Sequence, residues 1–364
     1  MGAEREMVGI GIIGAGFART TQIPGFRACA GARVVAIASG HRENAERVAR
    51  EFDIEHVAGD WREIIARDDV HLVSIVTPPV THAEMTLAAL DAGKAVLCEK
   101  PMAMNAAEAD RMRERALDAG LLNLIDHELR FLPGRRRMRE LLCAGEIGEV
   151  LHAKLLFRSD SRASPERPWN WWSDIEAGGG ALGAIGSHAV DAFRWLLDTE
   201  ILEVFCRLST HVNERVEPRT NELRPVTTDD EANLLFSFAN NALTKDATGT
   251  ISLSLVEPGR SEHRLEIFGS KGALMIEDDG VLWQAGVGQG QWQRVKEEGG
   301  ELAAGMRDAS WSRGFTMFSR AIVAALSEGR TEIEEAATFE DGYRTQLVLD
   351  AARRSDQSGR METV

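Results

Sequence analysis

The sequence has few cysteines and no cysteine motif. Its 364 residues include only four cysteines, and none forms a CxxC pair or a cluster with metal-ligand spacing. Isolated cysteines indicate small buried hydrophobic side chains in a reducing compartment, so we expect no disulfide, no metal site and a cytoplasmic location. The four residues are Cys29, Cys98, Cys143 and Cys206.

Positive charge is also scarce. Forty-two Lys and Arg residues stand against 57 Asp and Glu, for a formal net charge of −15. Because nucleic acid is bound through clustered positive charge, this balance argues against a nucleic-acid partner. The single basic run, Arg135–Arg137 with Arg139, is expected to form a solvated helix face. No apolar run reaches the roughly 18 residues of a membrane span, and the polar residues 1–7 predict no secretory leader.

The most informative stretch is VGIGIIGAGFART, residues 8–20. A strand-like apolar run meets two glycines, and a helix-compatible segment follows. The first glycine permits a tight turn, the second lets the backbone approach an anion, and the helix start offers free N–H groups. This pattern indicates a dinucleotide pyrophosphate site, although Arg19 stands at the sixth position, where Gly or Ala is usual. The expected cofactor-binding residues here are Gly14, Gly16, Phe17 and Ala18.

Strand-like and helix-like segments alternate through residues 33–126. Such alternation predicts a doubly wound parallel sheet with helices on both faces, in which ligands bind at the carboxyl ends of the strands. The second strand ends at Ser39, followed by Arg42, rather than at the acid usual in NAD sites. Because Ser and Arg can bind a 2′-phosphate, NADP is favoured over NAD, which stays open. Alternatively, Ser39 caps a helix and Arg42 is a surface residue.

Two further segments carry candidate catalytic side chains. Lys100 follows a strand that should end in the ligand crevice, where its ammonium could reach a substrate oxygen; a plain surface lysine is the alternative. In the second half, three glycines at 178–180 lead into a helix that carries His188 and Asp191 on one face. A His with a carboxylate suits proton transfer, although the two could simply bond each other in a polar pocket.

Two longer motifs resemble one enzyme family. The runs TPPVTHAEMTLAALDAGKAVLCEKP, residues 77–101, and GGGALGAIGSHAVDAFRWLL, residues 178–197, resemble the glucose–fructose oxidoreductase and inositol dehydrogenase family, Gfo/Idh/MocA. The resemblance implies that Lys100 is catalytic or orients the substrate, that the Lys100–Pro101 bond is cis, and that His188 transfers the proton. Ala184 stands where many members have a catalytic Asp; this departure leaves open altered chemistry, a substitute such as Asp191, which would also orient His188, or lost activity. The expected cofactor site also includes Thr77, Pro78, His82, Glu99 and Lys100.

The fold expected from these patterns has two parts. Residues 1–127 should form a Rossmann domain, and residues 128–355 an α+β domain with a large, mostly antiparallel open sheet. Residues 356–364 should be a frayed polar tail. The open sheet suggests a homodimer or homotetramer. Trp169, Trp171 and Trp172 are expected to serve packing, or alternatively a platform for a sugar ring.

The expected function is that of an NAD(P)-dependent dehydrogenase acting on CH–OH groups. The resemblance alone implies the substrate, a secondary alcohol or ketone of a sugar, polyol or cyclitol. Two alternatives stay open. One is a dinucleotide-binding regulator without turnover, suggested by Ala184. The other is cofactor-assisted glycoside cleavage on the same fold.

Overall fold

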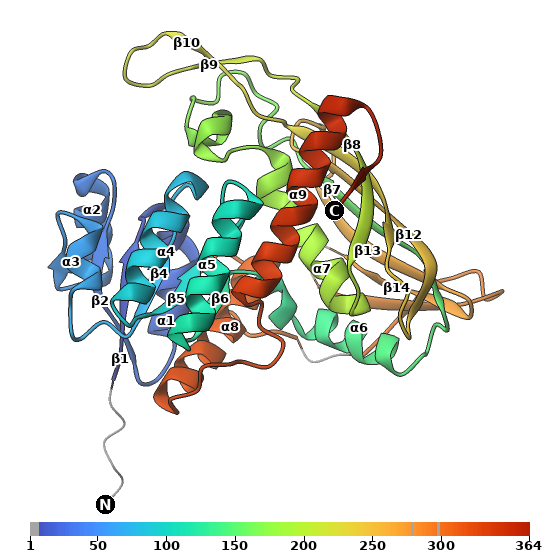
Figure 1. Ribbon diagram of the computed structural model, residues 1–364, viewed down its shortest axis with the longest axis horizontal. Helices are drawn as coiled ribbons and strands as arrows, with labels where there is room; N and C mark the ends of the chain where they lie inside the picture. Colours follow the sequence, from blue (N-terminus) through green and yellow to red (C-terminus); the bar gives the residue numbers. More distant parts are fainter. Residues whose placement is uncertain (1–6, 278–279, 297–298) are drawn as a thin grey trace, which may run out of the picture. The chain divides into compact units, whose positions relative to one another are not determined.

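The computed structural model describes residues 7–277, 280–296 and 299–364 (Figure 1). The prediction on a leader in residues 1–7 therefore lies almost wholly outside the described residues. The chain divides into two compact units. The first unit comprises Met1–Leu132 with Gly300–Tyr343, and the second comprises Pro133–Gly299 with Arg344–Val364. No helix among the described residues has the length and apolar character needed to cross a membrane.

The first unit is built on a parallel sheet of six strands in the order β3-β2-β1-β4-β5-β6. Every residue of the central strand β1 is buried, as expected for a strand with helices on both faces. Successive side chains of β1 enter different cores, with Ile12 in one cluster and Ile13 in the other. The strands are β1 Val8–Ile13, β2 Ala32–Ala38, β3 His56–Val57, β4 Leu72–Ile75, β5 Ala95–Cys98 and β6 Asn123–Ile125.

Helices alternate with the strands of the first unit, as the sequence predicts. Both ends of helix α5 have a local cause. The Asn105 side chain caps its first turn, and Gly120, with φ +61°, ends it after Ala119. The segment after the glycine turn begins as a short π-helix, η1 Ala18–Gln22. The α-helices are α1 Ile23–Arg27, α2 Arg42–Phe52, α3 Trp61–Ile65, α4 His82–Asp91, α5 Ala106–Ala119 and α8 Ser310–Ser327.

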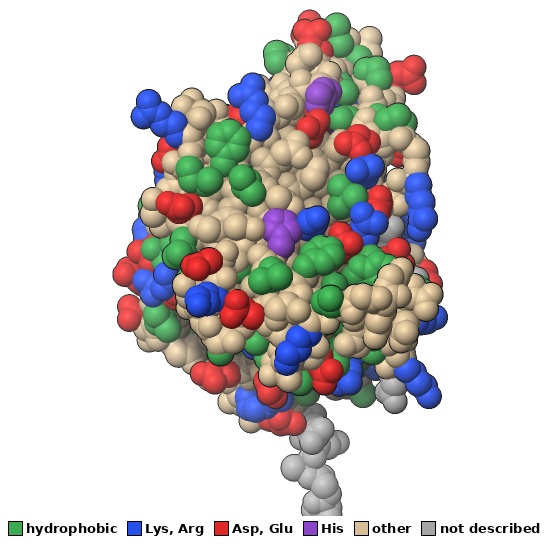
Figure 2. All heavy atoms as spheres, turned by 90° about the vertical axis from the view of Figure 1, so that its right-hand side faces the viewer, with side chains coloured by type: hydrophobic (Ala, Val, Ile, Leu, Met, Phe, Trp, Pro, Cys, Tyr) green, Lys and Arg blue, Asp and Glu red, His purple; other side chains and the backbone are tan. Residues whose placement is uncertain are grey.

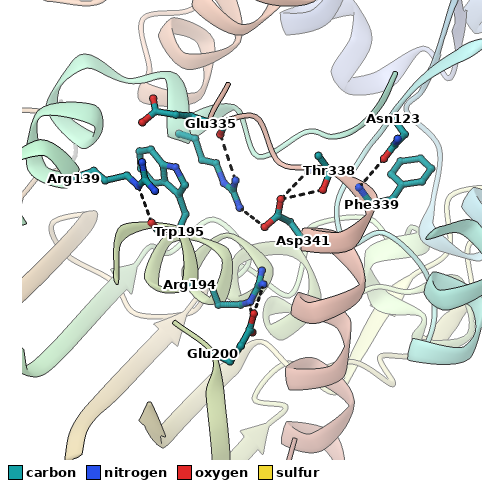
Figure 3. A network of polar contacts seen from close by, with 10 residues as sticks. Asn123, Arg139, Arg194, Trp195, Glu200, Glu335, Thr338, Phe339 and Asp341 are labelled. Carbon is teal, nitrogen blue, oxygen red and sulfur yellow. Dashed lines mark hydrogen bonds and ion pairs between the residues drawn. The ribbon is translucent and has the colours of Figure 1, made fainter. Parts of the chain in front are cut away.

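Residues 300–343 lie in the first unit, whereas the sequence suggested a single boundary at 127/128. Phe318 of α8 stacks on Phe131, with ring centroids 4.6 Å apart. The Asn123 side chain accepts a hydrogen bond from the Phe339 N–H at 3.1 Å, and Asp341 accepts from Thr338 (Figure 3). Buried aromatic contacts and these hydrogen bonds join the segment to the sheet, although it is far away in the sequence.

The second unit contains a mixed sheet of nine strands in the order β16-β15-β14-β13-β7-β12-β11-β8-β17. Only β7 and β12 pair in parallel; the other described pairs are antiparallel. This confirms the expected large, mostly antiparallel sheet. Its strands are β7 Val150–Arg158, β8 Ile201–Ser209, β11 Glu231–Phe238, β12 Thr244–Ser254, β13 Glu262–Gly269, β14 Gly272–Ile276, β15 Leu282–Gly286, β16 Gln293–Arg294 and β17 Glu362–Thr363.

One face of this sheet shares a core with three helices: α6 Pro133–Cys143, α7 Ser187–Leu197 and the later part of α9 Phe339–Ser358. At the start of β8, Arg194 of α7 forms a double hydrogen bond to Glu200, at 2.7 and 2.8 Å (Figure 3). On the other face, Phe205 and Leu235 are cross-strand neighbours and are 38% and 45% exposed. Figure 2 looks onto the side of Figure 1 where this sheet lies and shows hydrophobic side chains in separate groups among charged ones.

Three expectations are corrected. Residues 356–364 are not frayed, because α9 runs to Ser358 and β17 pairs with β8. The basic run is only in part a solvated face: Arg137 is exposed, but α6 turns Arg135 toward its buried side, where it is 3% exposed. Cys143 is exposed, whereas the other three cysteines are buried and all four are free.

Candidate active site

The glycine turn has the geometry that its sequence predicts. Gly14 has φ +113°, and a Cβ built on it would lie 2.2 Å from the Val76 carbonyl oxygen, so no other residue fits without a shift. Around Gly16, by contrast, a Cβ would meet nothing within 4 Å. The backbone at Phe17 is already helical. The turn therefore leaves an open cradle beside the start of a helical segment, which fits a dinucleotide diphosphate.

The unusual sixth position of the fingerprint has a structural explanation. Arg19 is exposed and pairs with Glu51 of α2 at 2.6 Å. Ala18, one residue earlier, is fully buried. The small residue needed for close helix–sheet packing is thus supplied by Ala18, because the π-helical turn η1 changes which position faces the sheet.

The register of the sheet brings three predicted segments together. Ile13 of β1 is the partner of Ile75 of β4, which is also the partner of Cys98 of β5. Residues directly after these strand ends therefore emerge at the same edge. These are the glycine turn at 14–16, the Thr77-Pro78-Pro79 turn and Glu99-Lys100-Pro101.

His82 joins two of these segments. The side chain is fully buried, and its ring nitrogens lie 2.9 Å from the Thr77 carbonyl oxygen and 3.1 Å from the Pro101 carbonyl oxygen. Burial lowers the pKa of His82. The Lys100–Pro101 bond is cis, as the resemblance implies. His82 therefore lies between two loops of this edge, and as a neutral imidazole it donates to one of the two carbonyl oxygens at a time.

The second strand ends as the sequence suggests, with no acid at its tip. Helix α2 begins at Arg42, and Glu43 already lies in its first turn. The residue that caps this helix is His41, so Ser39 is not the cap. Arg42 is exposed and forms a 2.9 Å ion pair with Glu46 one turn later. The guanidinium is thus held at the surface beside the end of β2.

A buried polar network, which the sequence reasoning missed, adjoins the backbone of Lys100. The Gln22 side-chain amide donates to Glu99 at 3.0 Å and to Asp126 at 2.9 Å. Its oxygen accepts from the Ser74 hydroxyl at 2.5 Å. The Lys100 backbone N–H donates to Glu99 at 3.3 Å. The sequence feature that could have revealed this network is a polar residue within or next to an apolar segment. Gln22 lies at the start of a helical segment, Ser74 lies within strand β4, and Asp126 follows strand β6.

Burial raises the pKa of both carboxyl groups of this network. Burial, together with the neighbouring charges of Glu99 and Glu128, raises the pKa of Asp126 well above its ordinary value. Burial also raises the pKa of Glu99, which the positive charge of Lys100 opposes. We therefore describe Asp126 as the neutral acid of this network, which leaves the negative charge on Glu99, next to Lys100.

The candidate proton-transfer residues lie in the second unit. His188 is half-buried and Asp191 is 2% exposed, both on α7. Ala184 is buried in the short π-helix η6 Leu182–Gly186 that precedes α7. The structure thus places Lys100 in the first unit and the His188–Asp191 segment in the second.

A carboxylate that the sequence reasoning missed supports this segment. Asp229 accepts a hydrogen bond from the Leu182 N–H at 2.6 Å. Gly180 has φ +110°, and a Cβ there would lie 2.3 Å from Asp229. Burial raises the pKa of Asp229 to about 6, although the Leu182 N–H opposes this shift. The third glycine of the motif is therefore required by its positive φ and by the close approach of a half-buried acid.

The fold and the glycine turn define a dinucleotide-binding oxidoreductase with a second, sheet-based domain. Residues 8–127 match the oxidoreductase family with an NAD-binding Rossmann fold, and residues 135–275 match the GFO/IDH/MocA C-terminal domain. An uncharacterized oxidoreductase of Synechocystis sp. is 34% identical over 273 residues, covering 75% of this chain and 72% of that protein. The chain belongs to the GFO/IDH/MocA oxidoreductase family, and its first domain has the NAD-binding Rossmann fold of that family.

Other relatives carry more specific descriptions. Levoglucosan dehydrogenase of Pseudarthrobacter phenanthrenivorans is 32% identical over 254 residues, 66% of this chain and 64% of that protein. A crystal structure of an oxidoreductase domain protein from Kribbella flavida has a TM-score of 0.87 and 31% identity over 99% of each chain. A structure of levoglucosan dehydrogenase with NADH and levoglucosan also has a TM-score of 0.87, at 27% identity, covering 99% of this chain and 100% of that one.

Proposed function

We propose that this protein is an NAD(P)-dependent dehydrogenase that moves a hydride between nicotinamide and a secondary alcohol or ketone carbon of a sugar, polyol or cyclitol. The carrying observation is the open cradle at Gly16, at the same sheet edge as the Glu99-Lys100-Pro101 segment. The NADH and levoglucosan complex of a 27% identical protein supports the substrate class. Three buried free cysteines support a cytoplasmic location.

The bound nicotinamide would supply or accept the hydride. The backbone of residues 14–17 would bind the diphosphate, and Ser39 and Arg42 would lie beside the adenosine ribose. Because no acid stands at the end of β2, we propose a preference for NADP over NAD. Comparison of the dissociation constants of both cofactors by calorimetry tests this preference.

The chain's own residues would handle the oxygen and its proton. His188 removes the hydroxyl proton or returns it, Asp191 orients the ring, and the Lys100 ammonium polarises the oxygen. General acid–base catalysis of this kind contributes about 10²–10⁴-fold to the rate. The positive charge of Lys100 acts on Glu99, and a positive charge at this place suits a group that stabilises negative charge on oxygen.

The test measures nicotinamide reduction with a panel of sugars and polyols. Lys100→Met and His188→Asn should each lower kcat by at least about 10²-fold. Lys94→Met and His211→Asn are matched controls. Lys94 precedes the other end of the same strand and donates to a backbone carbonyl, and His211 is exposed. Unchanged turnover in both active-site variants would refute the roles proposed here.

Ala184 supports one alternative, a dinucleotide-binding regulator without turnover. This residue is buried in η6, and as an alanine it offers no carboxylate at this position. Cofactor binding by calorimetry without reduction of any panel substrate would favour the regulator.

We also propose that the chain forms a homodimer or homotetramer through the open face of its nine-stranded sheet. The exposed pair of Phe205 and Leu235 lies on neighbouring strands of that face. Burying the face against a second copy would remove this apolar surface from water.

A further inference from the structure

Two arginine side chains are buried in the second unit, outside the residues used so far. Arg215 lies on the short strand β9 Glu214–Val216, which pairs with β10 Leu223–Pro225, and is 2% exposed. Arg162 lies in the loop after β7 and is 9% exposed. Two buried guanidinium groups are unusual, because moving a charge out of water is expensive unless it is paired.

Arg215 organises the loop that carries Arg162. Its guanidinium donates to the carbonyl oxygens of Arg162 at 2.6 Å and Ser164 at 2.7 Å. A further, longer contact of 3.4 Å joins it to the Arg167 carbonyl oxygen. The loop of residues 162–167 thus wraps around the Arg215 guanidinium, which accounts for three of its carbonyl oxygens.

The guanidinium of Arg162 has a different environment. It lies over the ring of Trp172, with its central carbon 4.4 Å from the ring centroid. Within the described part of the chain it makes no hydrogen bond and no ion pair. Burial, and then the charges of Arg167 and Arg215, lower the pKa of Arg162 to about 9, while Asp230 opposes the shift. The charge at Arg162 therefore lacks a hydrogen-bonded anion.

Asp230 does not supply that anion. Its carboxylate oxygens accept 3.0 Å hydrogen bonds from the backbone N–H groups of His211 and Val212. Three arginines thus share one region with a carboxylate that already holds a loop. Of the three charged groups that shift the pKa of Arg162, two are positive and one is negative, in a chain whose overall charge is strongly negative.

The Arg162–Trp172 pair is attached to the proposed proton-transfer segment. The Trp172 carbonyl oxygen accepts from the Thr228 hydroxyl at 2.9 Å. A Cβ on Gly179 would lie 2.4 Å from the same oxygen. Gly179 belongs to the loop that leads through η6 into α7 and His188. Backbone packing therefore links the arginine pair to that loop.

The faces of two tryptophans are partly taken by cations. Arg162 covers Trp172, and Arg224 lies 3.5 Å from the ring centroid of Trp169. This arrangement is poorly suited to a platform for a neutral sugar ring. A guanidinium held by its face keeps its edge N–H groups available for an oxyanion in its plane.

We propose that Arg162, with Arg167 and Arg215, forms a subsite for the oxyanion of an acidic sugar, so that the substrate carries a carboxylate or a phosphate. This rests on the proposed dehydrogenase function and names its substrate class. The planar fork of Arg162 suits a carboxylate, as in a uronic or aldonic acid. A sugar phosphate shares the same chemistry and is a separate arm of the test.

Calorimetry on the full chain compares matched ligands: glucuronate, galacturonate, gluconate and glucose 6-phosphate against glucose, galactose and sorbitol. At least one anionic ligand should bind more tightly than its neutral counterpart. Arg162→Gln should weaken that anion by about 10- to 100-fold, the range for a charge-assisted hydrogen-bonded pair, and leave the neutral counterpart unchanged. Binding of glucose 6-phosphate but no sugar acid would assign the oxyanion to a phosphate.

Arg224→Gln is the matched control, because Arg224 also lies over a tryptophan but is exposed and pairs with Asp174. It should leave all affinities unchanged. If Arg162→Gln does not fold, Arg162→Lys serves instead: it keeps the charge, loses the fork, and should weaken the anion several-fold. The proposal is overturned if no anion binds in an Arg162-dependent manner, or if the Arg224 variant has the same effect.

Nicotinamide reduction separates this proposal from the proposed function. Arg162-dependent binding of an anion without reduction of NAD or NADP would leave the subsite standing and remove the dehydrogenase. Turnover of neutral sugars with no Arg162-dependent anion binding would support the dehydrogenase and remove the anion subsite.

Discussion

Asp126, the buried acid of the network with Gln22 and Glu99, allows a prediction about stability. Asp126 is fully buried and accepts from Gln22 at 2.9 Å. Asp126→Asn replaces the neutral acid by a group of the same shape that cannot ionise. Its amide N–H₂ can donate to Glu99 and its oxygen can accept from Gln22, so the network stays intact.

The pH dependence follows from the raised pKa of Asp126. Below the ordinary pKa of about 4, the carboxyl is protonated in both the folded and the unfolded chain and contributes no difference. Above it, the unfolded chain releases the proton while the folded chain keeps it. The free energy of unfolding then falls as pH rises, by about 1.4 kcal/mol per pH unit, up to the pKa of the folded protein. The Asn variant lacks this loss.

Urea unfolding of both proteins at pH 5, 6 and 7 measures the effect. The stability of wild type relative to Asp126→Asn should decline with each pH step, with the slope given above as its upper limit. Asp69→Asn is the control, because Arg67 lowers the pKa of Asp69, which is ionised in both states over this range. Parallel stability curves for wild type and Asp126→Asn would show that the folded protein holds no extra proton here.

Three further outcomes are expected. Gly14→Ala should destabilise the fold by at least about 1–3 kcal/mol and abolish the rise in melting temperature with NAD or NADP, because its Cβ would lie 2.2 Å from the Val76 carbonyl oxygen; an unchanged melting curve would contradict this. Arg42→Ala should lower the affinity for NADP about tenfold and spare NAD, as measured by calorimetry; equal losses would remove the proposed phosphate contact. Phe205→Glu should convert the oligomer to a monomer in light scattering, because it places a charge opposite Leu235; an unchanged mass would exclude this face as the interface.

Local patterns predicted much of the fold. The alternation of strands and helices through residues 33–126 was predictable, because caps, glycines and apolar periodicity act within a few residues. The glycine turn was also predictable, since its function needs particular residues at adjacent positions. The short strands β9 and β17 were not, because their pairing depends on partners elsewhere in the chain.

The sequence alone determined the family motifs, the parallel direction of the strands in the first sheet and the candidate residues Lys100 and His188. Only the tertiary structure decided which polar residues are buried together. Gln22 is 77 positions from Glu99 and 104 positions from Asp126, yet its side chain donates to both. Arg162 and Arg215 meet in the same way across 53 positions. Burial is a property of the packed chain, and it is burial that gives these charges their altered chemistry.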